Sequence, residues 1–277
     1  MAQIVRNVIS DKSYEIVKKL GETKRFNLYL CTCSKKAYIL KIASKPEFNI
    51  LLALEASILA DMRSHAAFLE DAYTKIKTDP NVLLNYQLCF PDIHDSFVSD
   101  KQKGRHLNII GFNAVEDVGN LVPVRHITTR DQVRVDCKTS AWMLGKLLKF
   151  IAFAHNQKMS CGRMTGDNVL IEREQHFILY FDMTRASYHG DEVPQDIRKT
   201  EIMKAAGIIT MALGGDSTTG EYFADEQDPE GKYASFVYHL VCGGESDANK
   251  AHSDFYTLVE LLWPRTFWPY TTFPLEG

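Results

Sequence analysis

The chain has 277 residues, a formal net charge of −3, 45% hydrophobic residues and 24% charged residues. This composition is ordinary for a folded globular protein, so it excludes a chain that is disordered throughout. No apolar run reaches the roughly 20 residues that a membrane-spanning helix needs, and the N-terminus lacks the apolar stretch of a secretion signal. We therefore expect an intracellular, cytoplasmic protein that binds neither a membrane nor nucleic acid.

Charged residues and cysteines are distributed unevenly along the chain. Between Lys12 and Lys45 there are nine Lys and Arg residues against two Glu, whereas between Asp182 and Asp254 fourteen acids stand against six bases. Two solvated faces of opposite sign explain this pattern, and the alternative is a basic N-terminal part that faces phosphates.

The six cysteines are scattered and complete no zinc-ligand pattern, so they are predicted to be reduced thiols.

The first part of the chain is predicted to be rich in strands. Alternating or continuous apolar runs separated by polar turns predict five strands, over 14–20, 28–33, 37–43, 90–98 and 106–113. Apolar residues at helical spacing predict one helix over 48–62 and a second over 66–77, the second ending before Asp79 and Pro80. The segment 119–130 shows no regular pattern.

The second part is predicted to be mainly helical. Helical spacing of apolar residues predicts four helices, over 140–157, 200–213, 233–242 and 251–262, and Gly214 follows the second of them as a C-cap. Between the first two helices, the runs 169–171 and 176–181 predict a hairpin. Strands followed by helices indicate the α+β class.

Three residues of the first part are of types that commonly occur in nucleotide-binding sites. Gly21 lies in a turn between two strands, where backbone N–H groups can meet phosphates, although an ordinary hairpin tip has the same sequence. Lys41 lies inside an apolar strand and Glu55 among the apolar positions of the next helix. The two charges can form a buried ion pair, and the alternative for each is a position that reaches solvent.

Two residues of the predicted hairpin are of types that commonly coordinate a metal cation. Asn168 and Asp182 stand on its two arms, and an amide oxygen beside a carboxylate suits Mg²⁺ bound to a nucleotide phosphate. The alternative is an Asn that closes a turn and an Asp that caps a helix.

In this order along the chain, the patterns resemble the protein kinase family. Lys41 resembles the strand lysine of its V-A-I-K motif, and Glu55 the helix partner of that lysine. Residues 161–168 resemble the catalytic loop, Asp182 stands where D-F-G is expected, and Pro194 where A-P-E is expected. The resemblance implies a bilobal fold, with an N-lobe over 1–113 and a C-lobe over 114–277, and it implies ATP and Mg²⁺ as cofactors.

The departures from the family pattern are equally specific. Arg163 replaces the catalytic Asp, and a guanidinium cannot accept the proton of a substrate hydroxyl. Met183 and Thr184 replace Phe and Gly, only one Gly of the phosphate loop remains, and no acid matches the one that anchors the catalytic loop, Glu201 being near but out of register. The resemblance is therefore to a pseudokinase, more an inactive kinase homologue than an active enzyme.

Three functions remain open at this point. The leading hypothesis is a pseudokinase that binds ATP and Mg²⁺ through Gly21, Lys41, Glu55, Asn168 and Asp182, and that acts through its conformation or a protein partner. The second is an active phosphotransferase that uses Asp167 as a surrogate base. The third is a scaffold that binds no nucleotide. His155 is expected to make a structural hydrogen bond. The aromatic tail is expected to pack on the C-lobe or to dock a partner; it comprises Trp263, Phe267, Trp268, Tyr270 and Phe273.

Overall fold

The computed structural model describes residues 3–78, 83–113, 115–222, 225–264 and 266–275. The chain divides into two compact units, the first formed by residues 1–121 and 183–185 and the second by residues 122–182 and 186–277. Within the described ranges, no helix combines the length and the apolar character that crossing a membrane requires.

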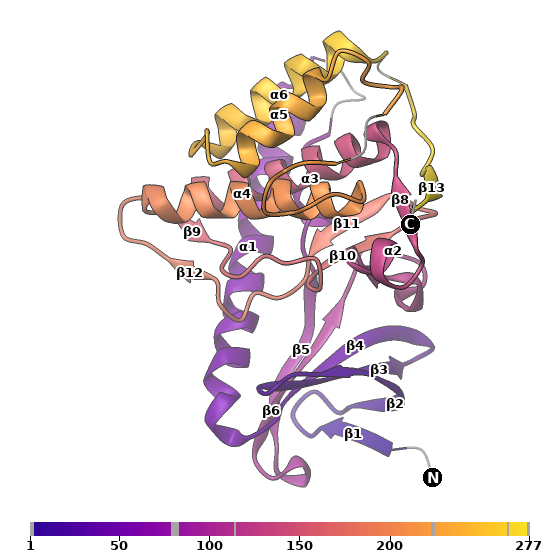
Figure 1. The fold of residues 1–277 in the computed structure, drawn as a ribbon. Coiled ribbons are helices and arrows are strands. Elements are labelled where there is room, and N and C mark those ends of the chain that lie inside the picture. The colour runs from indigo at the N-terminus through magenta and orange to yellow at the C-terminus, as the bar shows by residue number, and fades with distance from the viewer. Residues whose placement is uncertain (1–2, 79–82, 114, 223–224, 265, 276–277) are drawn as a thin grey trace. The chain divides into compact units, whose positions relative to one another are not determined.

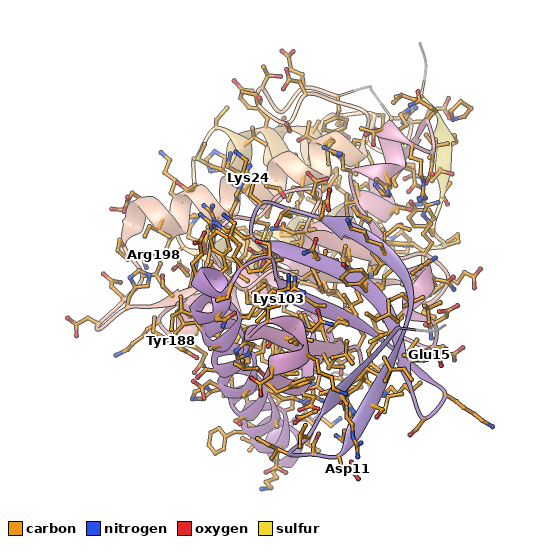
Figure 2. All side chains as sticks on the ribbon, turned by 90° about the horizontal axis from the view of Figure 1, so that it is seen from below. Asp11, Glu15, Lys24, Lys103, Tyr188 and Arg198 are labelled. Atoms are coloured by element: carbon orange, nitrogen blue, oxygen red, sulfur yellow. The ribbon has the colours of Figure 1, made fainter. Side chains whose placement is uncertain are left out.

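The first unit is built on one antiparallel sheet of six strands in the order β1-β2-β3-β4-β6-β5 (Figure 1). Its strands are β1 (Gln3–Asn7), β2 (Lys12–Glu22), β3 (Phe26–Cys33), β4 (Lys36–Ala43), β5 (Asp92–Ser99) and β6 (Arg105–Gly111). The predicted meander and the later strand pair are confirmed, and β1 is a strand that the sequence patterns missed. Charged side chains stand at the turns of this sheet, among them Asp11, Lys24 and Lys103 (Figure 2).

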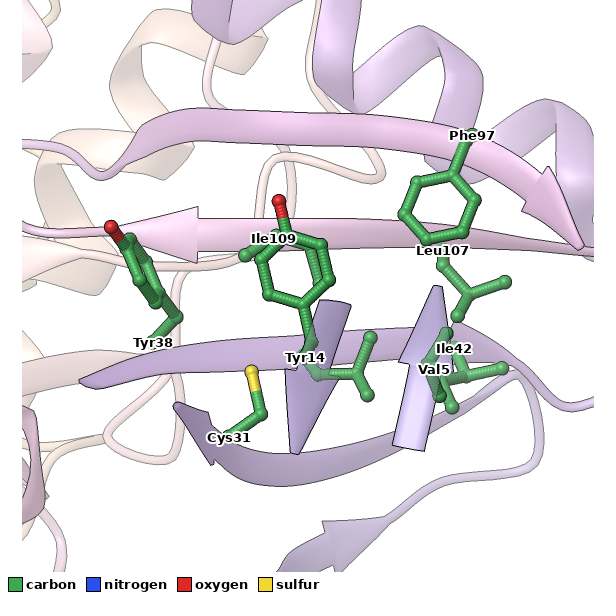
Figure 3. Close-up of a cluster of buried hydrophobic side chains, with 9 residues drawn as sticks. Val5, Tyr14, Cys31, Tyr38, Ile42, Phe97, Leu107 and Ile109 are labelled. Carbon is green, nitrogen blue, oxygen red and sulfur yellow. The ribbon is translucent and has the colours of Figure 1, made fainter. Parts of the chain in front are cut away.

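The sheet curls around a core, and polar contacts join its two outer strands. Buried side chains from β1 to β6 form one cluster: Val5, Tyr14, Cys31, Tyr38, Leu40, Ile42, Phe97, Leu107 and Ile109 (Figure 3). The Asp95 carboxylate on β5 accepts hydrogen bonds from Asn7 Nδ2 at 2.8 Å, Ser10 Oγ at 3.0 Å and the Tyr14 hydroxyl at 2.8 Å. One carboxylate therefore fixes the N-terminal strand against a strand about ninety residues later.

A single long helix, α1 (Asn49–Ile76), packs against β5 and β6. The prediction of two helices is wrong here: Ile58, Met62 and Ala66 are buried on one continuous face, and neither Gly nor Pro interrupts the segment between the two predicted helices. Asp79 and Pro80, at the predicted end of the second helix, lie outside the described residues. The described part of the unit also contains short 3₁₀ turns, namely η1 (Pro46–Phe48), η2 (Tyr86–Leu88), η3 (Asp100–Gln102) and η4 (Val118–Asn120).

The second unit is mainly helical. Its helices are α2 (His126–Thr129), α3 (Cys137–Asn156), α4 (Gln195–Ala212), α5 (Lys232–Val241) and α6 (Ala248–Leu262). The four predicted helices are confirmed, and Gly214 has the positive φ of +81° of a C-cap glycine. Segment 119–130 is less irregular than its sequence suggests, since it contains η4, β7 and α2.

Short strand pairs complete the second unit. The hairpin β10 (Val169–Glu172) and β11 (Phe177–Tyr180) is confirmed, and β7 (Val122–Pro123) extends it. β9 (Met159–Ser160) pairs with β12 (Ser187–Tyr188), and β8 (Val133–Val135) pairs with β13 (Thr272–Pro274). The last pair ties the tail of the chain to the second unit.

Candidate functional site

Lys41 and Glu55 form a buried ion pair in the first unit. Lys41 lies on β4 and Glu55 on α1, and Lys41 Nζ is 2.7 Å from Glu55 Oε1. The side chains are 2% and 0% exposed. The predicted pairing of these two residues is therefore present, and neither side chain reaches solvent. A buried pair adds little stability of its own and needs further hydrogen bonds to satisfy both ions.

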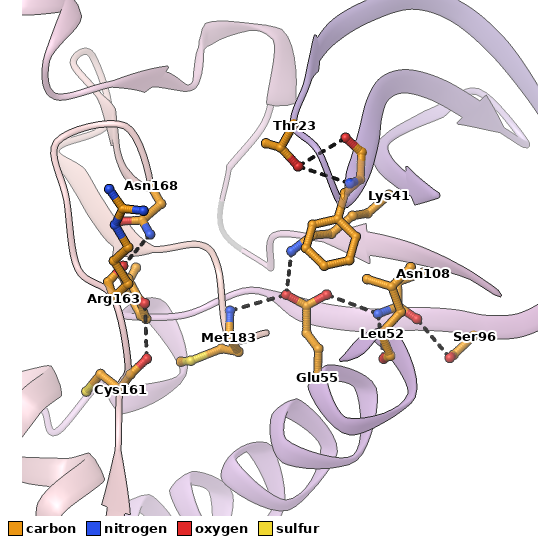
Figure 4. A network of polar contacts seen from close by, with 12 residues as sticks. Thr23, Lys41, Leu52, Glu55, Ser96, Asn108, Cys161, Arg163, Asn168 and Met183 are labelled. Atoms are coloured by element: carbon orange, nitrogen blue, oxygen red, sulfur yellow. Dashed lines mark hydrogen bonds and ion pairs between the residues drawn. The ribbon is translucent and has the colours of Figure 1, made fainter. Parts of the chain in front are cut away.

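The Glu55 carboxylate has those further hydrogen bonds (Figure 4). Asn108 Nδ2, on β6, donates to Glu55 Oε2 at 3.1 Å and to the Leu52 carbonyl at 3.0 Å. The backbone N–H of Met183, one of the three residues 183–185 that belong to this unit, donates to Glu55 Oε1 at 3.2 Å. The carboxylate is thus fixed from β4 by Lys41, from β6 by Asn108 and from the segment after Asp182 by Met183.

Asn108 is a functional residue that the sequence analysis missed. It stands directly opposite Lys41 in the pairing of β4 with β6, and it is fully buried. Ser96 Oγ donates to Asn108 Oδ1 at 2.9 Å and lies 2.8 Å from His106 Nε2. The available signal was a lone amide among the apolar residues of a strand, since a buried amide must find polar partners.

The turn before β3 covers Lys41. The Thr23 hydroxyl accepts hydrogen bonds from the backbone N–H of Arg25 at 3.2 Å and of Phe26 at 3.0 Å, while Thr23 N–H donates to the Phe26 carbonyl at 2.8 Å. The Phe26 ring, 5% exposed, lies 4.8 Å from Lys41 Nζ, which is the range of a cation–π contact. Three N–H groups of this turn therefore bond within the turn itself.

Gly21 lies inside β2 and outside this turn. It pairs with Leu28 next to a register shift in the β2–β3 ladder, and a Cβ atom built on it would meet nothing within 4 Å. No close approach therefore requires glycine at this position. Its role in phosphate binding stays a prediction.

Loop 161–168 of the second unit is closed by Asn168. Asn168 Oδ1 accepts from Thr165 N–H at 2.8 Å and from the Thr165 hydroxyl at 3.3 Å, and its Nδ2 donates to the Arg163 carbonyl at 2.6 Å. Both lone pairs of the amide oxygen are therefore in use. Phe181 N–H donates to the Asn168 carbonyl at 2.8 Å, so the structure brings Asn168 next to the arm that leads into Asp182.

These residues fit Mg²⁺ only in part. Asp182 offers a carboxylate, the ligand type that Mg²⁺ prefers, but Asn168 would first have to release Thr165. Among the residues that the structure describes, no group of three or more His, Cys, Asp or Glu side chains is arranged to hold a metal ion. The amide of Asn168 acts here as a turn residue, which is the structural alternative that its sequence left open.

The charged side chains of the loop do not offer a ready base. Arg163 is exposed. Asp167 Oδ1 lies 3.1 Å from Arg125 Nε, and the two side chains are 57% and 51% exposed. The one carboxylate of the loop is therefore already engaged by a guanidinium.

Glu201 anchors the loop, and this is a second residue whose role the sequence analysis missed. From α4, Glu201 Oε1 accepts from Gly162 N–H at 2.8 Å, and Oε2 lies 2.8 Å from His155 Nε2. His155 thus makes the structural hydrogen bond expected of it. Burial, and then the Glu201 charge, raise the pKa of the Cys161 thiol well above its usual value, so this cysteine stays protonated. The sequence signal for this role of Glu201 was an acidic residue among the apolar residues of a predicted helix.

The segment after Asp182 is short and tied down. Met183 and Thr184 are buried, and β12 pairs Ser187 with Ser160 of β9. Pro194 is the N-cap of α4.

Comparison with solved structures identifies the fold. The structure of vaccinia related kinase 3 superimposes with a TM-score of 0.61 over 94% of this chain and 91% of that one, at 12% identity. A double mutant of the PknI kinase domain of Mycobacterium tuberculosis gives a TM-score of 0.53 over 89% of this chain and 96% of that one, at 10% identity. No protein-family model and no curated protein sequence matches the chain. At such identities the likeness concerns the fold alone, and the chain has the bilobal protein-kinase-like fold that its sequence predicted.

Proposed function

We propose that this kinase-like chain is a pseudokinase, a protein that transfers no phosphate and acts through its conformation or a protein partner. The observation that carries the proposal is the charge pattern of loop 161–168. An exposed guanidinium stands where a proton acceptor is needed, and the one acid of the loop faces Arg125 at 3.1 Å. The loop therefore has no acid besides the ion-paired Asp167 that could accept a proton from a substrate hydroxyl.

Retained nucleotide binding is the second part of the proposal. A buried Lys–Glu pair contributes little stability, so its presence supports a role in holding phosphates. Lys41 would supply the positive charge, and Asp182 a carboxylate for Mg²⁺. Phe26 would have to leave Lys41 before a phosphate could reach it.

A phosphate-transfer assay with radiolabelled ATP and a generic protein substrate separates this proposal from an active enzyme. We expect no transfer by the unmodified chain, and none by Asp167→Asn or Arg163→Gln. Transfer that survives in Arg163→Gln and disappears in Asp167→Asn would assign the base to Asp167 and overturn the proposal. Glu192→Gln, at an exposed acid outside the loop, is the matched control.

A scaffold without nucleotide binding is the second candidate, and two observations favour it. The turn before β3 uses its N–H groups internally, and Asn168 has no lone pair left on its amide oxygen. Calorimetric titration with ATP and Mg²⁺ decides between the two candidates. Binding that is lost in Lys41→Met supports the pseudokinase with a nucleotide; absence of heat in the unmodified chain supports the scaffold.

A further inference from the structure

All three tryptophans of the chain line one cavity in the second unit. The cavity has a volume of about 350 Å³ and lies where α3, α6 and the aromatic tail meet. Its aromatic walls are formed by Trp142, His176, Phe255, Trp263, Phe267 and Trp268. The volume lies in the range of small-molecule sites, which are concave, mostly apolar and provided with a few polar groups.

Close packing, a hydrogen bond and ring contacts within the second unit hold the walls of the cavity in place. On α3, a Cβ atom on Gly145 would lie 2.7 Å from a ring atom of Phe255, so glycine lets the two helices approach closely. Trp263 Nε1 donates to the Gln227 carbonyl at 2.9 Å. The Trp263 ring meets that of Trp268 edge-to-face at 5.7 Å. The tail therefore packs on the second unit, as one of its two alternatives predicted, and this packing shapes the cavity.

One aromatic ring of the cavity lining, that of Phe267, is largely exposed to solvent. Phe267 is 78% exposed, and it stacks on His176 with 4.8 Å between centroids and 8° between planes. His176 in turn lies 5.1 Å from the Trp142 ring. The stacked pair of His176 and Phe267, with Phe267 exposed, offers further planar groups a favourable surface.

The polar groups of the lining give the cavity a charge preference. Lys146 and Glu260 are its two ionic side chains, and no residue that the structure describes forms an ion pair or hydrogen bond with Lys146. Nearby, His252 meets the lining residue Tyr256 edge-to-face at 4.8 Å. Burial, and then the Lys149 and Lys146 charges, lower the pKa of His252 to about 4. An anion on Lys146 would therefore meet an ammonium group that is free to bind it, beside one lining carboxylate, Glu260.

We propose that this cavity binds a planar aromatic carboxylate, with its ring among the aromatic side chains and its carboxylate on Lys146. The rings supply stacking and apolar burial, and the ammonium group supplies a charge-assisted hydrogen bond. This site lies wholly within the second unit and does not depend on the proposed function.

The test follows the tryptophan indole N–H signals of the full chain by NMR during titration with 2-naphthoate. Each signal is assigned by the loss of one peak in a Trp→Phe variant. We expect saturable shifts of all three signals below about 1 mM ligand, weaker binding of the neutral 2-naphthamide, and weaker binding of cyclohexanecarboxylate, which has no aromatic ring. No saturable shift up to the solubility limit of 2-naphthoate would overturn the proposal.

Two variants locate the ligand. Lys146→Gln should weaken 2-naphthoate binding about fivefold and leave 2-naphthamide binding unchanged. Lys138→Gln, about two turns away from Lys146 on α3 and outside the lining, is the matched control. Phe267→Ala removes an exposed ring, leaves the core intact and should weaken both ligands. Equal binding of 2-naphthoate by Lys146→Gln and by the unmodified chain, or equal binding of the two carboxylates, would refute the assignment.

Discussion

The ring of Phe26 covers the ammonium group of Lys41, with 4.8 Å between Nζ and the ring centroid. Both side chains belong to the first unit, and Thr23 fixes the turn that places the ring there. The contact stabilises the cation at the position where a phosphate would otherwise do so. A nucleotide that used Lys41 would therefore have to compete with Phe26 for it.

Phe26→Ala should raise the affinity for ATP about thirtyfold, because a desolvated cation–π contact contributes about 2 kcal/mol. The variant loses about 3 kcal/mol of stability from its core, so calorimetry well below the unfolding temperature is the suitable measurement. Phe48→Ala is the control, since Phe48 packs in the same cluster as Phe26. An unchanged or lower affinity in Phe26→Ala would show that the ring does not restrict access.

Lys41→Met should lower the free energy of unfolding by about 3–5 kcal/mol, because the Glu55 carboxylate would remain buried without its cation. Glu55→Met in the same chain should regain most of that loss, since both charges are then absent. Urea denaturation of the two single variants and the double variant measures the coupling. If the two single effects simply add, the pair is not coupled in the folded state.

Glu201→Ala should detach loop 161–168 from α4. Gly162 N–H loses its acceptor and His155 its partner, which should lower the free energy of unfolding by about 2–4 kcal/mol. Hydrogen exchange at the Gly162 amide reports the local effect, and exchange should become faster than in Glu192→Ala, an exposed acid of the preceding segment. Unchanged protection of Gly162 would mean that another group anchors the loop.

His106 should make stability depend on pH. Burial lowers its pKa, so the unfolded chain takes up a proton at a higher pH than the folded chain. The contribution of His106 to the free energy of unfolding should therefore be complete above about pH 6.5, the pKa of an unfolded histidine. It should decrease as the pH falls from there toward the lower pKa of the folded chain. Denaturation between about pH 7 and pH 5 should show a flatter slope for His106→Gln than for His65→Gln, at an exposed position on α1. Equal slopes in the two variants would exclude this role.

Local patterns in the sequence were enough to place the ion pair. Strand alternation puts Lys41 inside the sheet and helical spacing puts Glu55 on the buried face of α1, so the pairing follows from two short segments. The hairpin was predicted in the same way, and it brings Asn168 next to Phe181, the residue before Asp182.

Residues that act across long separations could not be placed in this way. Asn108 meets Glu55 across 53 residues, and Glu201 meets Gly162 across 39. β1 depends on Asp95, 88 residues away from Asn7. In the sequence, Asn108 and Glu201 are isolated polar residues among apolar neighbours. Such a residue indicates that a polar partner exists, but it does not indicate which residue that partner is.

Phosphorus NMR of the chain with ATP and Mg²⁺ tests the central claim most directly, because one spectrum reports both binding and transfer. We predict that the ATP signals broaden or shift on addition of the chain, that they do so less with Lys41→Met, and that neither phosphoprotein nor free phosphate accumulates. Accumulation of either product by the unmodified chain, abolished in Asp167→Asn, would contradict the claim.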